Sequence, residues 1–296
     1  MARQFEILRS RALPYLLIAP IVLLVAAVSL YPAFYAVWLA STDANLLHLA
    51  RAKFIGLQNF ARMLDDDIFL AGLWRTLRWD VVVVGVELTL ALPMALFLNL
   101  RFRGRGLLRA AVVVPYIIPP AVTALLFVYA FDGSFGVVND ILVRLGLQAT
   151  YVSWLSDPLR SFAVVAGAMV WSGTPLMVIV LLAVLQSIPG ELYEAASIDG
   201  ASAWQAFRRI TLPHLMPTIL FLLLLRTIWM SNHIDMIFIT TRGGPGFANY
   251  TEALYSFMLT AQFDIGYASS VAVVLAVLLL AASAAYVRHL ARMVLA

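Results

Sequence analysis

Polar side chains of defined spacing interrupt two apolar regions of this sequence, and their types suit binding rather than catalysis. One group is E-A-A-S-I-D-G at Glu194–Gly200, and the other is R-T-I-W-M-S-N-H-I-D at Arg226–Asp235. The second group combines the ring of Trp229 with amide, imidazole and carboxylate side chains. A ring can cover the C–H face of a sugar while such polar groups bond its hydroxyls. This group therefore predicts a site for a polyhydroxylated ligand.

Helical spacing brings the second group together. It places Arg226, Trp229 and His233 roughly on one face. Asn232 lies beside that face, and Asp235 lies one turn beyond it. Because charge in hydrocarbon is costly, polar residues in apolar segments indicate a pathway or a buried partner. The residues predicted to belong to a substrate pathway are Arg226, Trp229, Asn232, His233, Asp235, Glu87 and Trp171.

The same residues could instead satisfy one another or a partner subunit. Arg226 would make a buried ion pair with Glu87, which lies in another apolar segment. Trp171, Ser172 and Thr174 either line a pathway or pack between segments. The four scattered histidines and the absence of cysteine give no metal-ligand spacing, so no metal site is expected.

The composition indicates where these residues must be held. Of 296 residues, 63% are hydrophobic and only 12% are charged, and the mean hydropathy is +0.92. A soluble domain carries about 25% charged residues. The sequence therefore predicts an integral membrane protein. The small positive excess comes mainly from arginines beside apolar runs, so it indicates membrane topology rather than nucleic-acid binding.

Continuous apolar runs rather than alternating ones predict an all-α polytopic membrane protein with six transmembrane helices. We expect Pro93, Pro115, Pro119, Pro120 and Pro175 to interrupt or kink them. The six predicted spans are Leu13–Ala40, Leu77–Leu100, Leu107–Phe131, Phe162–Gln186, Pro217–Thr240 and Ala268–Val287.

The short loop R-F-R-G-R-G-L-L-R, from Arg101 to Arg109, fixes the predicted orientation, because short basic loops remain inside. It places both termini in the cytoplasm. The N-terminal apolar run is too long for a signal peptide, so we interpret it as a retained first span. The predicted division is a cytoplasmic N-terminus at 1–12, a single transmembrane domain at 13–290 with a cytoplasmic loop at 187–213, and a cytoplasmic C-terminus at 291–296.

That cytoplasmic loop predicts two short helices joined by a turn. Pro189 suits the start of the first helix, and Asp199 with Gly200 is a turn signal. A second short helix, capped by Ser202, is expected to stop before Pro213. Small residues would let another protein approach closely, although an ordinary solvated loop would look similar.

Sequence motifs for ATP hydrolysis and other catalysis are absent. Lys53 is the only lysine, and no phosphate-binding loop surrounds it. There is also no zinc-protease or nucleophile-elbow pattern. We therefore expect this chain not to be an enzyme.

The pattern from Glu194 to Pro213 resembles the E-A-A loop of membrane subunits in binding-protein-dependent ATP-binding-cassette importers. L-N-L-R-F-R-G-R-G-L-L-R with V-P-Y-I-I-P-P-A-V, together with F-I-G-L-Q-N-F, T-R-G-G-P-G and F-D-I-G-Y-A-S, resembles the carbohydrate branch, on the side of its first, MalF-like permease subunit. The resemblance covers nearly the whole chain.

This resemblance implies that the loop is a coupling helix received by a separate ATP-binding subunit. The implied docking residues are Glu194, Ala195, Ala196, Asp199 and Gly200, with Glu191 as a neighbouring candidate. Further implied partners are a second permease subunit in a heterodimer, two copies of the ATP-binding subunit and an extracytoplasmic solute-binding protein. No cofactor is expected on this chain, since ATP and Mg would be bound by the ATPase. The implied location is the bacterial plasma (inner) membrane.

The substrate stays open at this level. A sugar, a polyol such as glycerol, or a glycerol-phosphate compound would all suit this type of permease. A remoter alternative is an ion-coupled secondary transporter using Glu87 and Asp235, but it would leave the cytoplasmic loop without a purpose.

Overall fold

A computed structural model describes residues 15–295 of the chain. The elements are mostly α-helices, joined by shorter π-helical and 3-10 segments labelled η. They are η1 (Ala26–Leu30), α2 (Tyr31–Ala40), η2 (Leu46–Arg51), α3 (Gln58–Arg62), η3 (Met63–Asp65), α4 (Asp67–Trp79), η4 (Asp80–Val84), α5 (Gly85–Asn99), α6 (Arg105–Ile117), α7 (Pro120–Ala130), α8 (Val137–Arg144), η5 (Trp154–Ser156), α9 (Pro158–Ser187), α10 (Gly190–Ile198), α11 (Ala203–Ala206), η6 (Phe207–Thr211), α12 (Leu212–Ser231), α13 (Asp235–Thr241), α14 (Glu252–Ala261) and α15 (Ile265–Leu295). The all-α prediction is confirmed.

The described residues contain five helices long and apolar enough to cross a membrane, and a bent pair of helices gives a sixth. The five are Tyr15–Ala40, Asp67–Asn99, Pro158–Ser187, Ala203–Ser231 and Ile265–Arg288, and the bent pair is Arg105–Ile117 with Pro120–Ala130. These agree with the six predicted spans in number and overlap each of them, although their bounds differ. The predicted N-terminal segment 1–12 lies outside the described residues.

The third predicted span, Leu107–Phe131, is a broken helix rather than a straight one. α6 and α7 meet at an angle of 93°. Two consecutive prolines explain the break, because each disfavours helical geometry in the residue before it. Ile118 precedes Pro119 and has ψ 126°, and Pro119 precedes Pro120 and has ψ 141°. By contrast, Pro93 and Pro175 lie inside unbroken helices.

The predicted fifth span, Pro217–Thr240, is wrong at both ends. α12 ends at Ser231, and α13 starts only at Asp235. The amide of Asn232 donates to the carbonyl of Ile228 at 2.8 Å, which is the kind of local side-chain bond that competes with helix continuation. His233 therefore follows the helix instead of lying on its face.

At the other end, the helix does not stop before Pro213. α11, η6 and α12 form one continuous helix, Ala203–Ser231. Pro213 lies in the first turn of α12, directly after the π-helical segment Phe207–Thr211. A π-helical turn shifts the hydrogen-bond register, so the missing proline N–H is accommodated without a break.

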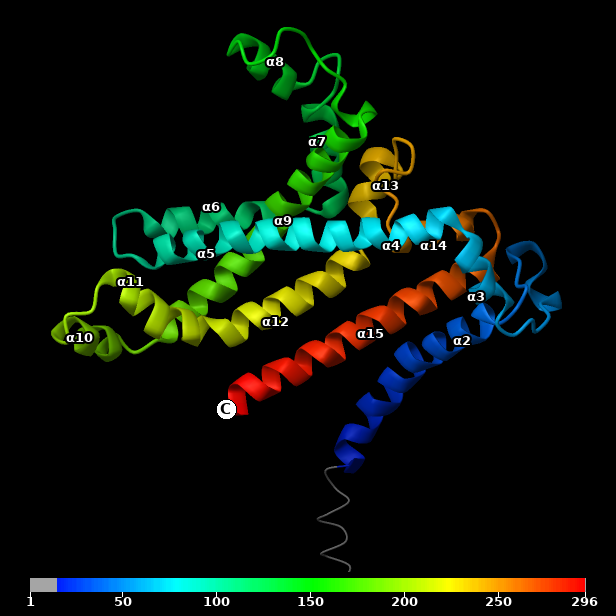
Figure 1. The fold of residues 1–296 in the computed structure, drawn as a ribbon, viewed down its shortest axis with the longest axis horizontal. Helices are drawn as coiled ribbons and strands as arrows, with labels where there is room; N and C mark the ends of the chain where they lie inside the picture. Colours follow the sequence, from blue (N-terminus) through cyan, green and yellow to red (C-terminus); the bar gives the residue numbers. More distant parts are fainter. Residues whose placement is uncertain (1–14, 296) are drawn as a thin grey trace, which may run out of the picture. The chain divides into compact units, whose positions relative to one another are not determined.

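The described residues form two compact units, one of residues 15–65 with Ser256–Val274 and one of Asp66–Tyr255 with residues 275–295. In the second unit, α9 is the central helix: it packs against α5, α6, α7 and α12, as Figure 1 shows. Its apolar segment is 56% buried, the largest fraction among the five unbroken candidate spans of the described residues. Asp157 caps its N-terminus by accepting from the N–H of Arg160.

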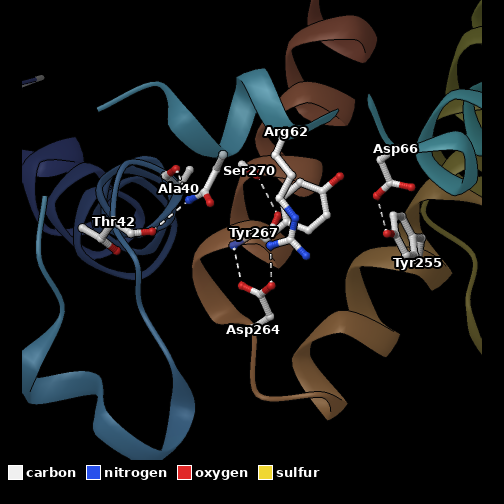
Figure 2. A network of polar contacts seen from close by, with 9 residues as sticks. Ala40, Thr42, Arg62, Asp66, Tyr255, Asp264, Tyr267 and Ser270 are labelled. Atoms are coloured by element: carbon white, nitrogen blue, oxygen red, sulfur yellow. Dashed lines mark hydrogen bonds and ion pairs between the residues drawn. The ribbon is translucent and has the colours of Figure 1, made fainter. Parts of the chain in front are cut away.

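In the first unit, polar contacts fasten the chain that follows α2. Asn59 is buried and donates to the carbonyls of Ala40 and Thr42 at 2.9 and 2.8 Å. Figure 2 shows a second part of this network, in which Arg62 pairs with Asp264 at 2.7 Å and lies over the ring of Tyr267. These contacts hold the start of α15 against α3.

Candidate functional site: a docking elbow and a membrane cavity

The cytoplasmic loop of the sequence analysis folds as an exposed pair of helices, α10 and α11, which we call the docking elbow. Gly200 has φ +74°, a left-handed conformation that suits glycine, so the predicted turn is confirmed. The hydroxyl of Ser202 accepts from the N–H of Gln205, and the N–H of Ser202 donates to Oε1 of Gln205, so the predicted cap is a full capping box.

The residues predicted for docking lie together on this elbow. Five of them are exposed and Ala196 is half-buried; the exposed ones are Glu191, Glu194, Ala195, Asp199 and Gly200. Two apolar residues that the prediction did not include are also exposed, Ile198 at 87% and Trp204 at 67%. Their signal in the sequence was an apolar residue on each side of the Asp-Gly turn.

One hydrogen bond ties α10 to the helical segment that follows α11. The hydroxyl of Tyr193 on α10 lies 2.9 Å from the hydroxyl of Thr211, which ends η6. Thr211 is buried. Because η6 continues into α12, this bond links α10 to the helix whose last turns line the cavity.

A cavity of about 360 Å³ opens between the helices of the second unit. Its walls come from the end of α6, the start of α7, the middle of α9, the last turn of α12 and the loop before α13. The polar residues in its lining are Tyr116, Ser172, Arg226, Asn232 and His233, and the apolar ones include Ile118, Met169, Trp229 and Met236.

Four of the seven residues predicted for the substrate pathway line the cavity. Arg226, Trp229, Asn232 and His233 all line it, although His233 does so from a loop rather than from a helix face. Trp229 is 46% exposed, so its ring is available to a ligand. The Nε2 atom of His233 is buried and has no hydrogen-bond partner among the described residues.

The other predicted pathway residues lie outside the lining. Asp235 is exposed at the start of α13. Trp171 packs on Phe127, with ring centroids 6.0 Å apart. Its neighbour Ser172 does line the cavity.

Glu87 approaches the cavity only through Arg226. The Nε atom of Arg226 donates to the carboxylate of Glu87 at 2.8 Å, and a second guanidinium nitrogen bonds the other carboxylate oxygen. The Glu87 side chain is fully buried, and that of Arg226 is 13% exposed. The ion pair that the sequence left as an alternative is confirmed.

Sequence reasoning missed the wall formed by Tyr116 and Ile118. These residues follow the basic loop and precede the double proline, so periodicity places them inside a straight span. The extended backbone at Ile118 and Pro119 turns this part of the chain toward the cavity. The pair Pro119–Pro120 was the only local signal.

Comparison with known proteins agrees with this geometry. Residues 87–294 match the family described as the binding-protein-dependent transport system inner membrane component. The chain is 36% identical to the sulfoquinovosyl glycerol transport system permease protein SmoG of Agrobacterium fabrum, over 95% of this chain and 91% of that protein. It is also 36% identical to the trehalose/maltose transport system permease protein MalF of Thermococcus litoralis, over 95% and 94%.

Solved structures show the same fold. A subunit of a bacterial ABC transporter that imports the acidic polysaccharide alginate superposes with a TM-score of 0.76 at 27% identity, covering 97% of this chain and 99% of that one. The alginate transporter in complex with its alginate pentasaccharide-bound periplasmic protein gives 0.75 at 25% identity, with 92% of both chains covered. The chain therefore belongs to the family of binding-protein-dependent transport system inner membrane components, the permease subunits of ATP-binding-cassette importers, whose ATPase is a separate subunit.

Proposed function

We propose that this chain forms the translocation pathway of an ATP-driven importer for a sugar or a related polyol. One observation carries the proposal: the continuous helix Ala203–Ser231 begins in the docking elbow and ends at Arg226 and Trp229 in the cavity wall. Trp229, Asn232 and His233 supply a ring and polar groups suited to hydroxylated cargo. A relative named for trehalose and maltose supports the same class.

The docking elbow then couples transport through the cavity to ATP hydrolysis on the partner. A separate ATP-binding subunit receives α10, and its nucleotide-driven motion displaces the elbow together with the helix that lines the cavity. Cargo moves because the cavity alternates between two states that differ in access and affinity. ATP and Mg are bound by the partner, and this chain contributes no cofactor site.

The assembly we propose pairs this chain with a second permease subunit, two copies of the ATP-binding subunit and an extracytoplasmic solute-binding protein. The elbow and both termini face the cytoplasm, which agrees with the basic loop from Arg101 to Arg109. Glycerol and glycerol-phosphate compounds stay as an alternative cargo, and a relative named for a glycerol conjugate favours it in part.

Reconstitution in proteoliposomes tests this proposal. The complete importer, with its binding protein on one side, is supplied with trehalose, maltose, glycerol or glycerol 3-phosphate. Uptake of at least one compound should require ATP on the side of the elbow. If this chain alone moved solute down an ion gradient without nucleotide, the secondary-transporter alternative would replace the proposal.

A further inference from the structure

The charged groups around the cavity indicate which charge its cargo can carry. Within residues 15–295, Arg226 is the only lining residue with a permanent charge. A guanidinium in a cavity wall is normally a strong site for carboxylate, sulfonate or phosphate, because it binds such groups through two parallel bonds. Taken alone, Arg226 would therefore predict an acidic cargo.

The structure shows that the edge of the Arg226 guanidinium that would form these two parallel bonds is already occupied. Two nitrogens of Arg226 bond the two carboxylate oxygens of Glu87, the geometry that an acidic cargo would otherwise take. Glu87 reaches the guanidinium from α5, and its side chain is fully buried.

The packing around the pair holds it in this place. A Cβ atom on Gly173 of α9 would clash with both the carboxylate of Glu87 and the guanidinium of Arg226. Because Gly173 has no side chain, there is room for the carboxylate and the guanidinium to meet. Glu87, Gly173 and Arg226 belong to α5, α9 and α12, and α9 packs against both other helices. Displacing the fully buried carboxylate of Glu87 would therefore require these helices to move apart.

Among the described residues, the rest of the lining adds no fixed positive charge. Ser172 and Asn232 offer a hydroxyl and an amide, and Trp229 offers a ring face, which carries a partial negative charge. Asp235 is exposed and lies outside the lining. An experiment at pH 8 keeps an ordinary imidazole, such as the side chain of His233 in the lining, uncharged.

We propose that Glu87 cancels the charge of Arg226 and thereby sets the cavity to accept uncharged sugars or polyols and to reject their carboxylated, sulfonated or phosphorylated counterparts. This inference rests on the proposed function and narrows its substrate class. Glu87 acts through Arg226 without touching the cargo, so it is a specificity-determining, positioning residue. The glycerol-phosphate alternative is thereby disfavoured.

Direct binding to the assembled permease–ATPase complex tests the inference, because the solute-binding protein, which selects cargo first, is left out. Equilibrium binding at pH 8 is measured for two matched probe pairs, glucose with glucuronate and glycerol with glycerol 3-phosphate. We expect the wild-type complex to favour the neutral member by about tenfold or more. Glu87→Gln should shift that ratio toward the anion by about tenfold or more, because an unpaired guanidinium then faces the cavity.

The double variant Glu87→Gln with Arg226→Gln is the matched control. It removes both charges and retains two hydrogen-bonding amides, so it should restore a neutral preference to within about threefold of wild type. Asn232→Arg is an independent second variant. It adds a charge at an exposed lining position while the pair stays intact, and it should raise anion binding.

The outcomes separate the two proposals. If the wild-type complex binds glucuronate as well as glucose, or a correctly assembled Glu87→Gln complex keeps the wild-type ratio, the inference is overturned while sugar import stands. If the Glu87→Gln complex fails to assemble, the inference is judged by three other measurements. These are the wild-type binding ratio, the ratio of the double variant and the anion binding of Asn232→Arg. Failure of ATP-dependent uptake of every carbohydrate tested in proteoliposomes would instead remove the proposed function.

Discussion

Gly173 lies directly beside the buried ion pair of Glu87 and Arg226, and its missing side chain leaves the space that the pair fills. The carboxylate of Glu87 and the guanidinium of Arg226 both occupy the place where a side chain at this position would begin. Breaking a buried pair is costly because each charge is then left without a partner in a region of low dielectric. The glycine, the acid and the arginine therefore act as one group.

Gly173→Ala should consequently destabilise the protein by about 1–3 kcal/mol, since the methyl group forces the pair apart or the helices to shift. Gly167→Ala on the same helix is the matched control, because its Cβ would meet only Phe127, at an ordinary 3.9 Å. Thermal unfolding of the two variants in detergent measures the difference. Equal melting temperatures for both would contradict the packing argument.

Glu252, outside the membrane spans, is a different kind of buried acid. Its side chain is enclosed against α4, where its backbone N–H donates to the hydroxyl of Thr76 at 2.9 Å. Among the described residues, neither of its carboxylate oxygens has a hydrogen-bond partner. Burial, and then the nearby carboxylate of Asp66, raise the pKa of Glu252 to about 8, while Arg75 lowers it.

This pKa predicts a pH-dependent stability with a definite sign. Between the ordinary value of 4.5 and about 8, the folded protein holds a proton that the unfolded chain has released. The free energy of unfolding should therefore fall as pH rises through this window and level off above it. Glu252→Gln removes that loss, so its advantage over wild type should grow from pH 5 to pH 8.

Melting temperatures of both proteins across this pH range provide the measurement. Glu191→Gln, which changes an exposed acid of the docking elbow, is the control and should follow the wild-type curve. Parallel curves for wild type and Glu252→Gln would show that this carboxyl is ionised in the folded protein.

At the scale of elements, the central feature is the helix Ala203–Ser231, which combines a capped start, a π-helical turn and a long apolar segment. The π-helical turn lets Pro213 sit inside a continuous helix. As a result, the elbow and the cavity wall share one rigid element, and Tyr193 fastens α10 to it through Thr211.

A double-mutant cycle tests whether this bond transmits motion. Tyr193→Phe and Thr211→Val each remove the hydroxyl contact and leave the shape nearly unchanged. Each should lower the sugar carried per ATP hydrolysed, and the double variant should add little to either. A coupling energy of about 0.5–1.5 kcal/mol in the stability measurement is expected. Fully additive losses would mean that the two hydroxyls act separately.

At the scale of the whole molecule, the protein is a permease subunit, and ATP is hydrolysed by a separate subunit. Its docking elbow is exposed and acidic, with apolar Ile198 and Trp204 beside the acids, as expected of a surface that another subunit covers. The elbow leads directly into α12, which carries Arg226 and Trp229 to the cavity wall.

Glu194→Lys should therefore leave folding intact and lower ATP-dependent uptake about tenfold or more, because reversing a charge in a docking interface disrupts its fit. Uptake in proteoliposomes, with ATP hydrolysis measured in parallel, gives the readout. Asp65→Lys makes the same charge change at an exposed acid outside the elbow and should transport normally. Undiminished uptake by Glu194→Lys would count against the elbow as the docking site.

The sequence by itself determined the features that depend on neighbouring residues. Hydropathy located six spans, since each apolar run in lipid must satisfy its backbone hydrogen bonds within its own helix. Gly200 and Ser202 predicted the turn and the cap, because both are fixed by bonds within a few residues. The family resemblance, carried by the E-A-A pattern, also proved correct.

Only the tertiary structure decided which polar groups meet. Glu87 and Arg226 are 139 residues apart, and nothing local distinguishes their pairing from a ligand role. Helical periodicity placed His233 on a helix that in fact ends at Ser231, and it gave no reason to place Tyr116 in the cavity wall. The physical reason is that a cavity is bounded by packing between distant segments, and packing depends on where helices break and cross.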